Sequence, residues 1–341
     1  MSQTVRIGIN GLGRIGRTIL REFAIRKAEG KYKNIEIVAA NNPGDLSHLC
    51  RLLKYDSLHG RFQGRVAVEN GKLIAGDMSL RMFQTYDPKE IDWASEKVDI
   101  VVDATGVFKD KAGLGQHLGD TVKKVIMCAP GKDLDGTFVV GINHEEYDSK
   151  NHDIISNASC TTNCLAPVAK ALHEAFGIEH GLMTTVHSYT SDQMLLDGSH
   201  KDPRRARAAA MSMVPTTTGA AKAVGLVLPE LKGKLDGFAI RVPTPDVSLV
   251  DLTVKLTKKA SKEEINNALK EASEGSLKGV LGYETEPLVS VDYMGNPLSS
   301  IVDADMTSVI GDSAKVISWY DNEVGFSNRV LDLANHVASK L

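Results

Sequence analysis

The chain has 341 residues, of which 42% are hydrophobic and 24% are charged, and its formal net charge is −3. Two globular domains fit this length, and the charge gives no support for a nucleic-acid or membrane partner. We expect a soluble cytoplasmic protein, because the sequence has no run of about 18 apolar residues and no basic region followed by an apolar stretch at its start.

The first part of the chain alternates short apolar runs with helical patterns. Residues 5–11 are an apolar run that ends in glycine, which is typical of a buried parallel strand, and residues 14–27 carry apolar side chains at helical spacing. Further strands are predicted over residues 35–42, 98–106, 123–130 and 137–143. This α/β alternation predicts a Rossmann-type parallel sheet and a dinucleotide-binding domain over residues 1–158.

The second part has a different pattern. The segments 181–189, 233–243 and 247–256 are longer and rich in β-branched residues, which predicts a broad mixed or antiparallel sheet in an α+β catalytic domain over residues 159–321. Between these strands, residues 191–213 are polar and basic with little periodicity. A loop of this length in a compact domain is usually functional or interfacial.

Two helices are predicted in the last third of the chain. Residues 261–273 begin with serine and carry a glutamate three residues later, which is the signature of a capped helix. The final helix, at about residues 322–341, is expected to pack back on the first domain.

A glycine-rich turn follows the first strand. Gly11, Gly13 and Gly16 match G-x-G-x-x-G and open the first helix. In that setting the glycines allow a tight turn, approach of the backbone to a pyrophosphate, and close helix–strand packing. A generic strand–turn–helix is the alternative, and the motif alone does not exclude it.

The residue at the end of the second strand leaves the choice of cofactor open. A dinucleotide fold that prefers NAD usually has an acid there, but this chain has Asn41 and Asn42. Asparagine can bond a ribose hydroxyl but does not repel a 2′-phosphate. NADP therefore remains possible beside NAD.

A cysteine lies where the segment SNASCTT runs into a helical pattern. Cys160 would have a lowered thiol pKa at a helix N-terminus, and its small polar neighbours leave room for a substrate. Residue chemistry alone leaves nucleophile and core cysteine equally open. Cys164, one turn further on, is expected to be buried structure. The pair lacks the second pair of ligands that zinc would need, and we expect no metal.

The candidate base is His187, one of ten histidines. It ends an apolar strand and directly precedes a hydroxyl-rich loop. A neutral imidazole in this place could take the thiol proton.

Several residues between positions 190 and 241 predict anion sites. Hydroxyl groups and a glycine precede a helix at TTTGAAKAV, and an unpaired Arg241 inside an apolar strand would be costly without an anion or carboxylate partner. A solvated surface is the alternative for the arginines of RRAR. The candidate residues are Thr190, Asp192, Arg205, Thr217, Thr218, Gly219 and Arg241. They suggest a phosphorylated substrate.

Eight motifs together resemble one family over essentially the whole chain. They are INGLGRIGR, YDSLHGRF, SNASCTTNCLAP, GLMTTVHSYTSDQ, HKDPRRARAAA, PTTTGAAKAVGLVLPELKGKLDG, RVPTPDVSLVDLTVKL and SWYDNEVGFSNR. In this order they closely resemble bacterial-type, phosphorylating glyceraldehyde-3-phosphate dehydrogenase.

The resemblance implies an enzyme of glycolysis or gluconeogenesis that forms a covalent intermediate with its substrate. Cys160 would attack the aldehyde to give a thiohemiacetal, and His187 would act as base and assist hydride departure to the nicotinamide. Inorganic phosphate would then attack the resulting thioester and release an acyl phosphate. It also implies a homotetramer in which the loop near residues 188–213 lines a neighbouring subunit's cofactor site.

The resemblance further implies three sets of binding residues. The site for the phosphate of glyceraldehyde 3-phosphate would be Thr190, Asp192 and Arg241. The site for attacking phosphate would be Ser159, Thr161, Arg205, Thr218 and Gly219. The cofactor residues would be Gly11, Gly13, Arg14, Ile15, Gly16, Asn42, Thr105, Gly106, Cys128 and Asn322.

Two departures from the family pattern bear on the cofactor. Asn42 replaces a usual aspartate, and Gly198 and Ser199 resemble NADP-using members, so NAD is expected with NADP or dual use open. Cys128 replaces a common serine, which we expect to be benign.

Erythrose-4-phosphate dehydrogenase is the nearest alternative, but its relatives alter HSYTSDQ and TTTGAA, which are intact here. An alternative of another class is an NAD-binding surface or RNA-interacting protein, as a second role.

Overall fold

The computed structural model describes residues 4–341 and separates into two compact units. Unit 1 contains the chain up to Phe138, His144–Ala158 and Ser327–Leu341, and unit 2 contains Val139–Asn143 and Ser159–Phe326. Met1–Gln3, where the first predicted domain begins, lie outside the described residues. In the described part of the chain, no helix is long and apolar enough to cross a membrane.

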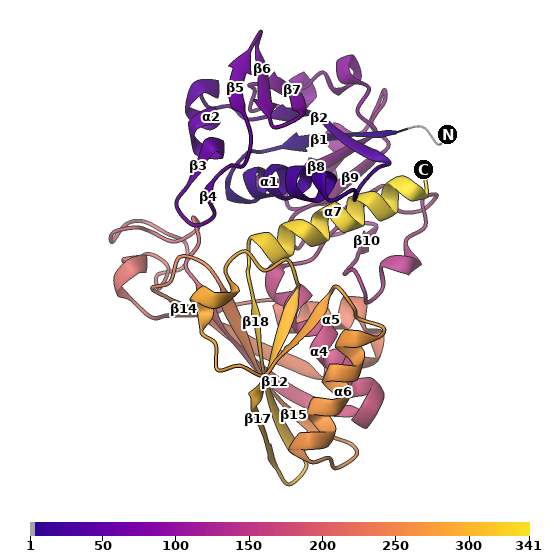
Figure 1. Cartoon of the computed structure of the whole chain (residues 1–341), viewed down its shortest axis with the longest axis vertical. Helices are drawn as coiled ribbons and strands as arrows, with labels where there is room; N and C mark the ends of the chain where they lie inside the picture. The colour runs from indigo at the N-terminus through magenta and orange to yellow at the C-terminus, as the bar shows by residue number, and fades with distance from the viewer. Residues whose placement is uncertain (1–3) are drawn as a thin grey trace. The chain divides into compact units, whose positions relative to one another are not determined.

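A single sheet forms the centre of unit 1 (Figure 1). From edge to edge its strands are β10 (Gly136–Thr137), β11 (Ile154–Ser156), β9 (Lys124–Met127), β8 (Ile100–Asp103), β1 (Val5–Asn10), β2 (Ile35–Asn41), β7 (Met78–Phe83), β6 (Lys72–Ala75) and β5 (Val66–Glu69). The strands from β10 to β7 pair in parallel, while β6 and β5 are antiparallel. The predicted Rossmann-type sheet is therefore confirmed, with an antiparallel edge that the sequence patterns did not predict.

Helix α1 (Arg14–Ala28) follows β1 because the glycine turn permits it. Gly11 has φ +92°, a conformation that favours glycine. A Cβ on Gly16 would lie 2.0 Å from the Gly11 carbonyl oxygen, so no other residue fits there without movement. The other helices of this part are α2 (Leu46–Lys54) and α3 (Lys111–Leu114), and a two-stranded ribbon pairs β3 (Tyr55–Asp56) with β4 (Gly60–Arg61).

The strand predicted over residues 137–143 is wrong beyond Thr137. After β10 the backbone turns, and Gly141 has φ +83°, which is incompatible with an extended strand. Phe138 and Val139 are nevertheless buried. Part of this apolar run therefore belongs to the core without being a strand, because burial alone does not require ladder pairing.

A broad mixed sheet forms the centre of unit 2, as predicted. Its strands are, in order, β13 (Val214–Thr217), β14 (Leu235–Val242), β12 (Ile178–Ser188), β15 (Ser248–Leu256), β18 (Ser313–Tyr320), β17 (Ser300–Ile310) and β16 (Leu281–Glu284). Pairs β12–β14 and β16–β17 are parallel and the remaining pairs are antiparallel.

Helices α4 (Cys160–Phe176), α5 (Ala220–Val227) and α6 (Lys262–Glu274) cover one face of this sheet (Figure 1). Helix α6 has the predicted capping box between Ser261 and Glu264. The chain between β12 and β13 is irregular apart from a short 3₁₀ turn at Ala209–Met211, as predicted for residues 191–213. The last helix, α7, is Val324–Ser339.

Candidate active site

Cys160 is the first residue of α4, as predicted. Ser159 is the N-cap, and its side chain accepts a hydrogen bond from the Thr162 N–H. This cap fixes the start of the helix, so that the Cys160 side chain lies at the positive end of the helix dipole. Cys164 is fully buried, and its Sγ lies 3.2 Å from Ser318 Oγ. Cys160 is therefore at the start of the helix, whereas Cys164 belongs to the core.

His187 lies in β12 next to its last residue, Ser188, and reaches Cys160 across 27 residues of sequence. Its Nε2 is 3.5 Å from Cys160 Sγ, and its Nδ1 is 2.7 Å from the carbonyl oxygen of Ser188. The same Nδ1 lies 3.1 Å from Arg241 Nη1, which only donates, but its contact with the Ser188 carbonyl oxygen, which only accepts, is shorter. The shorter contact indicates that Nδ1 carries the proton in the neutral ring. The lone pair of Nε2 then faces the thiol, which is the arrangement that a general base requires.

Burial sets the charge state of this pair. Burial lowers the pKa of His187 to about 3, and the positive charge of Arg241 lowers it further. Burial raises the pKa of the Cys160 thiol, so the lowered pKa expected from its place at a helix start is wrong: desolvation of the thiolate outweighs the groups that stabilise it. Arg241 and the Thr161 N–H act in the opposite sense on Cys160, because both stabilise a thiolate. The resting pair is therefore a neutral imidazole beside a protonated thiol, with groups in place to stabilise the anion once it forms.

Arg241 lies in β14, and its guanidinium turns toward His187. Nη1 is 3.0 Å from the Ser188 carbonyl oxygen and 3.3 Å from Thr190 Oγ1. Its Nε is buried without a hydrogen-bond partner among the described residues. A buried guanidinium donor without a partner is suited to an incoming anion.

Arg205 lies in the long loop. It was predicted to bind the attacking phosphate, yet it contacts Asp192, which was predicted for the phosphate of the substrate. It forms an ion pair with Asp192, donates from Nε to Thr216 Oγ1 at 3.0 Å, and donates from Nη2 to the Thr217 carbonyl oxygen at 3.2 Å. The ion pair lowers the pKa of Asp192 although partial burial opposes this.

The other predicted phosphate residues lie at helix starts. The Thr218 hydroxyl accepts from the Ala220 N–H, and Gly219 is the N-cap of α5 without a side-chain cap. The Thr161 hydroxyl lies 2.8 Å from Tyr320 OH. Tyr320 also contacts Thr185 at 2.9 Å, and its ring packs edge-on against His187. Sequence reasoning missed Tyr320, and its only signal was its place in the motif SWYDNEVGF.

Asn322 is held by two serines that sequence reasoning also missed. The hydroxyls of Ser188 and Ser248 each donate to Asn322 Oδ1 at 2.7 Å. The three residues come from strands or loops far apart in the chain, so no local pattern could have identified the set.

In unit 1, the residues predicted to bind the cofactor lie where β1, β2, β8 and β9 end, whereas Asn322 belongs to unit 2. A Cβ on Gly11 would touch Thr105 N at 2.9 Å, and the Leu12 N–H donates to Asn42 Oδ1 at 3.2 Å. Because β1 lies between β8 and β2, this is the topological switch point where open parallel sheets bind ligands.

The N-terminus of α1 fits a dinucleotide pyrophosphate. Its N-cap, Gly13, provides no side-chain cap, and the first turn, which contains Arg14, Ile15 and Gly16, has no acidic residue. A Cβ on Gly13 would meet nothing within 4 Å, so open space adjoins the first-turn N–H groups. Such a terminus is suited to phosphate oxygens.

A buried hydrogen-bond network fixes the backbone and side chains at the ends of β1 and β8. Asp103 Oδ1 accepts from the N–H and hydroxyl of Thr105 at 3.2 and 2.8 Å, and Asp103 Oδ2 accepts from Asn10 Nδ2 at 2.8 Å. Gly106 has φ +67° and follows directly. Burial raises the pKa of Cys128, at the end of β9, so this thiol stays protonated.

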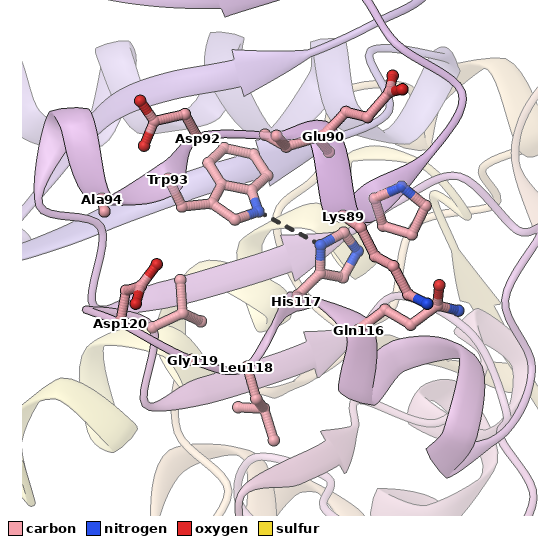
Figure 2. Close-up of a pocket in the computed structure, with 13 residues that line it drawn as sticks. Lys89, Glu90, Asp92, Trp93, Ala94, Gln116, His117, Leu118, Gly119 and Asp120 are labelled. Atoms are coloured by element: carbon pink, nitrogen blue, oxygen red, sulfur yellow. Dashed lines mark hydrogen bonds between the residues drawn. The ribbon is translucent and has the colours of Figure 1, made fainter.

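A cavity of about 370 Å³ lies at another place in unit 1. Figure 2 shows Trp93 and His117 against it, with Trp93 Nε1 donating to His117 Nδ1 at 3.3 Å. His117 in turn lies 3.6 Å from Asp103, which holds Thr105. None of the predicted cofactor residues that the structure describes is among its lining residues.

Comparison with known proteins agrees with this arrangement. Residues 5–111 match the model for the NAD-binding domain of glyceraldehyde 3-phosphate dehydrogenase, and residues 159–322 match the model for its C-terminal domain. The chain is 56% identical over 337 residues to glyceraldehyde-3-phosphate dehydrogenase of Priestia megaterium, covering 98% of this chain and 99% of the relative. It is 56% identical to the enzyme of Geobacillus stearothermophilus and 55% identical to glyceraldehyde-3-phosphate dehydrogenase 1 of Bacillus subtilis, each with the same coverage.

Proposed function

The chain belongs to the glyceraldehyde-3-phosphate dehydrogenase family, and we propose that it oxidises D-glyceraldehyde 3-phosphate to 1,3-bisphosphoglycerate with inorganic phosphate. It is an NAD(P)-dependent oxidoreductase. The observation that carries the proposed mechanism is the 3.5 Å approach of His187 Nε2 to Cys160 Sγ at the start of α4.

The reaction begins with the thiol. Cys160 Sγ attacks the aldehyde carbon, a C–S bond forms, and His187 Nε2 accepts the thiol proton. N–H groups at the start of α4 stabilise the developing oxyanion. The proton then passes from Nε2 to that oxygen, which gives a thiohemiacetal.

His187 acts a second time as base. It takes the hydroxyl proton of the thiohemiacetal as the carbon is oxidised to a thioester, and a bound nicotinamide cofactor would accept the hydride. Inorganic phosphate then attacks the thioester carbon, the C–S bond breaks, and the Cys160 thiolate leaves and takes up a proton. Arg241 favours this departure because its charge stabilises the thiolate.

Thr190, Asp192 and Arg241 are the proposed site for the substrate's phosphate. The buried, unpartnered Nε of Arg241 supports this assignment, and Asp192 contributes by holding Arg205. Ser159, Thr161, Arg205, Thr218 and Gly219 are the proposed site for attacking phosphate. It is supported by the two helix starts that these residues form, at α4 and α5.

Residues 1–158 are the proposed dinucleotide-binding domain and residues 159–321 the proposed catalytic domain, with the C-terminal helix completing the first. The cofactor would be held by the residues of the α1 turn, by Asn42, Thr105, Gly106 and Cys128, and by Asn322. NAD is the expected preference, with NADP or dual use as alternatives that the next experiments distinguish.

A cytoplasmic homotetramer with a role in glycolysis or gluconeogenesis is part of the proposal. The long loop leaves Leu195, Leu196, Met211 and Met213 from 73% to 84% exposed. Several large exposed apolar side chains on one loop are typical of an interface. They support the role of this loop in subunit contacts.

Steady-state kinetics test the proposal directly. With inorganic phosphate present, we expect kcat/KM for glyceraldehyde 3-phosphate to exceed that for erythrose 4-phosphate, and phosphate omission to abolish sustained turnover. A preference for erythrose 4-phosphate would contradict the substrate assignment. The names of relatives at 50–56% identity favour glyceraldehyde 3-phosphate.

Asn42→Asp is expected to raise KM for NADP by about tenfold while changing KM for NAD little. The new carboxylate can still accept from the Leu12 N–H, but it adds a negative charge that repels the 2′-phosphate by about 1 kcal/mol or more. Asn42→Ala, which removes the amide without adding charge, is the control. Equal changes for the two cofactors in Asn42→Asp would contradict the repulsion.

A further inference from the structure

The geometry points to a site for a divalent transition-metal ion of the zinc class, which we propose is formed by His144, Glu145 and His336. His144 and Glu145 belong to the 3₁₀ turn His144–Glu146, and His336 lies in the last turn of α7. All three residues are in unit 1. Each offers one ligand atom, and these atoms all lie within 4.8 Å of one another.

One ring nitrogen of His336 is available as a metal ligand. Its Nε2 is buried without a hydrogen-bond partner among the described residues. The ring also hydrogen-bonds the backbone of His144, and this bond must use Nδ1 because Nε2 has no partner. Nδ1 is then the donor, and Nε2 presents a lone pair. Metal-binding histidines usually have this arrangement, in which the far nitrogen donates to a carbonyl and fixes the ring.

The spacing of the other two ligands suits tetrahedral zinc. His144 Nε2 and Glu145 Oε1 are 3.4 Å apart. Zinc bonds of about 2.0–2.1 Å place neighbouring ligand atoms about 3.3–3.4 Å apart in a tetrahedron. The rings of His144 and His336 are 5.0 Å apart and tilted by 57°, so they are not stacked face to face.

Binding an ion requires little rearrangement of the side chains. Glu145 is 73% exposed, so its carboxylate can rotate toward the site without leaving a buried position.

The donor set selects the class of ion. Two imidazole nitrogens and one carboxylate oxygen suit zinc, whereas magnesium and calcium prefer oxygen ligands and copper(I) prefers sulfur. Three protein ligands leave the fourth position for water. A bound ion would therefore join the end of α7 to the turn at residues 144–146, and it would stabilise the folded protein.

The test measures Zn²⁺ binding by equilibrium dialysis in a Cys160→Ser background, so that the active-site thiol does not compete. We expect His336→Ala to lower the stoichiometry by one equivalent and Glu145→Gln to raise Kd by at least about tenfold. Co²⁺ in place of Zn²⁺ should show the absorption of a tetrahedral nitrogen–oxygen site, and this absorption should be lost in both variants.

A matched control is available in β12. Glu179 and His180 are also adjacent, with His180 Nδ1 3.8 Å from the carboxylate, but both are exposed. His180→Ala should leave binding and the Co²⁺ spectrum unchanged. Zn²⁺ should raise Tm in the parent and not in Glu145→Gln, whose exposed side chain can change without loss of packing.

Three results would overturn the proposal. One is a parent protein that binds no Zn²⁺ by dialysis. A second is unchanged binding in Glu145→Gln and His336→Ala. The third is an equal loss of binding in His180→Ala, which would mean that adsorption to surface histidines accounts for the uptake.

Discussion

Cys160→Ser is expected to abolish oxidation of glyceraldehyde 3-phosphate, with kcat falling on the order of 10⁴-fold or more. A serine hydroxyl is far less acidic than a thiol, so transfer of its proton to His187 Nε2 is much less favourable than transfer of the Cys160 proton. The ester that serine would form is also less reactive toward phosphate than a thioester. Both covalent steps are therefore lost together.

The measurement is cofactor reduction at saturating substrate and phosphate, together with mass spectrometry of the enzyme for an acylated residue. Cys50→Ser is the control, because Cys50 lies on α2 in unit 1 and is none of the proposed catalytic or binding residues. It should retain activity. Turnover of Cys160→Ser near that of the wild type would disprove the covalent mechanism.

His187→Asn is expected to lower kcat by about 10²–10⁴-fold and to slow alkylation of Cys160 by iodoacetamide at neutral pH. Burial raises the pKa of Cys160, so the thiol depends on Nε2 to accept its proton. An asparagine side chain cannot accept a proton. The alkylation rate of the variant should recover as pH rises, because hydroxide then ionises the thiol directly.

The pH dependence of the wild type follows from the sign of the His187 shift. A histidine whose pKa falls to about 3 stays neutral as pH drops through 6.5, so the base remains available. The plot of alkylation rate against pH should therefore show no decrease with a midpoint near pH 6.5, which protonation of an ordinary histidine would cause. A midpoint there would contradict the effect of burial and of Arg241.

His180→Asn is the control for this prediction, because His180 lies in the same strand but is exposed. It should leave kcat and alkylation unchanged. If His187→Asn also leaves the alkylation rate unchanged, the start of α4 and Arg241 alone would generate the thiolate, and His187 would have another role.

The sequence patterns predicted the fold well where local periodicity and burial agree. Apolar runs separated by the glycine turn predicted parallel strands and α1, because a glycine with positive φ and a helix start are local properties. The run at residues 137–143 was misread, since Val139 and its neighbours fill core without pairing. The antiparallel strands β5 and β6 were missed because strands of four residues carry little periodic signal.

The chain by itself determined the individual chemical groups of the site: a thiol at a helix start, a histidine at a strand end, and an arginine within an apolar strand. Only the tertiary structure decided how they meet. It set the 3.5 Å contact of Cys160 with His187, the pairing of Arg205 with Asp192, and the contact of Tyr320 with Thr161. Local sequence acts through backbone geometry and burial over a few residues. Contacts between distant strands depend on sheet register, which long-range packing selects.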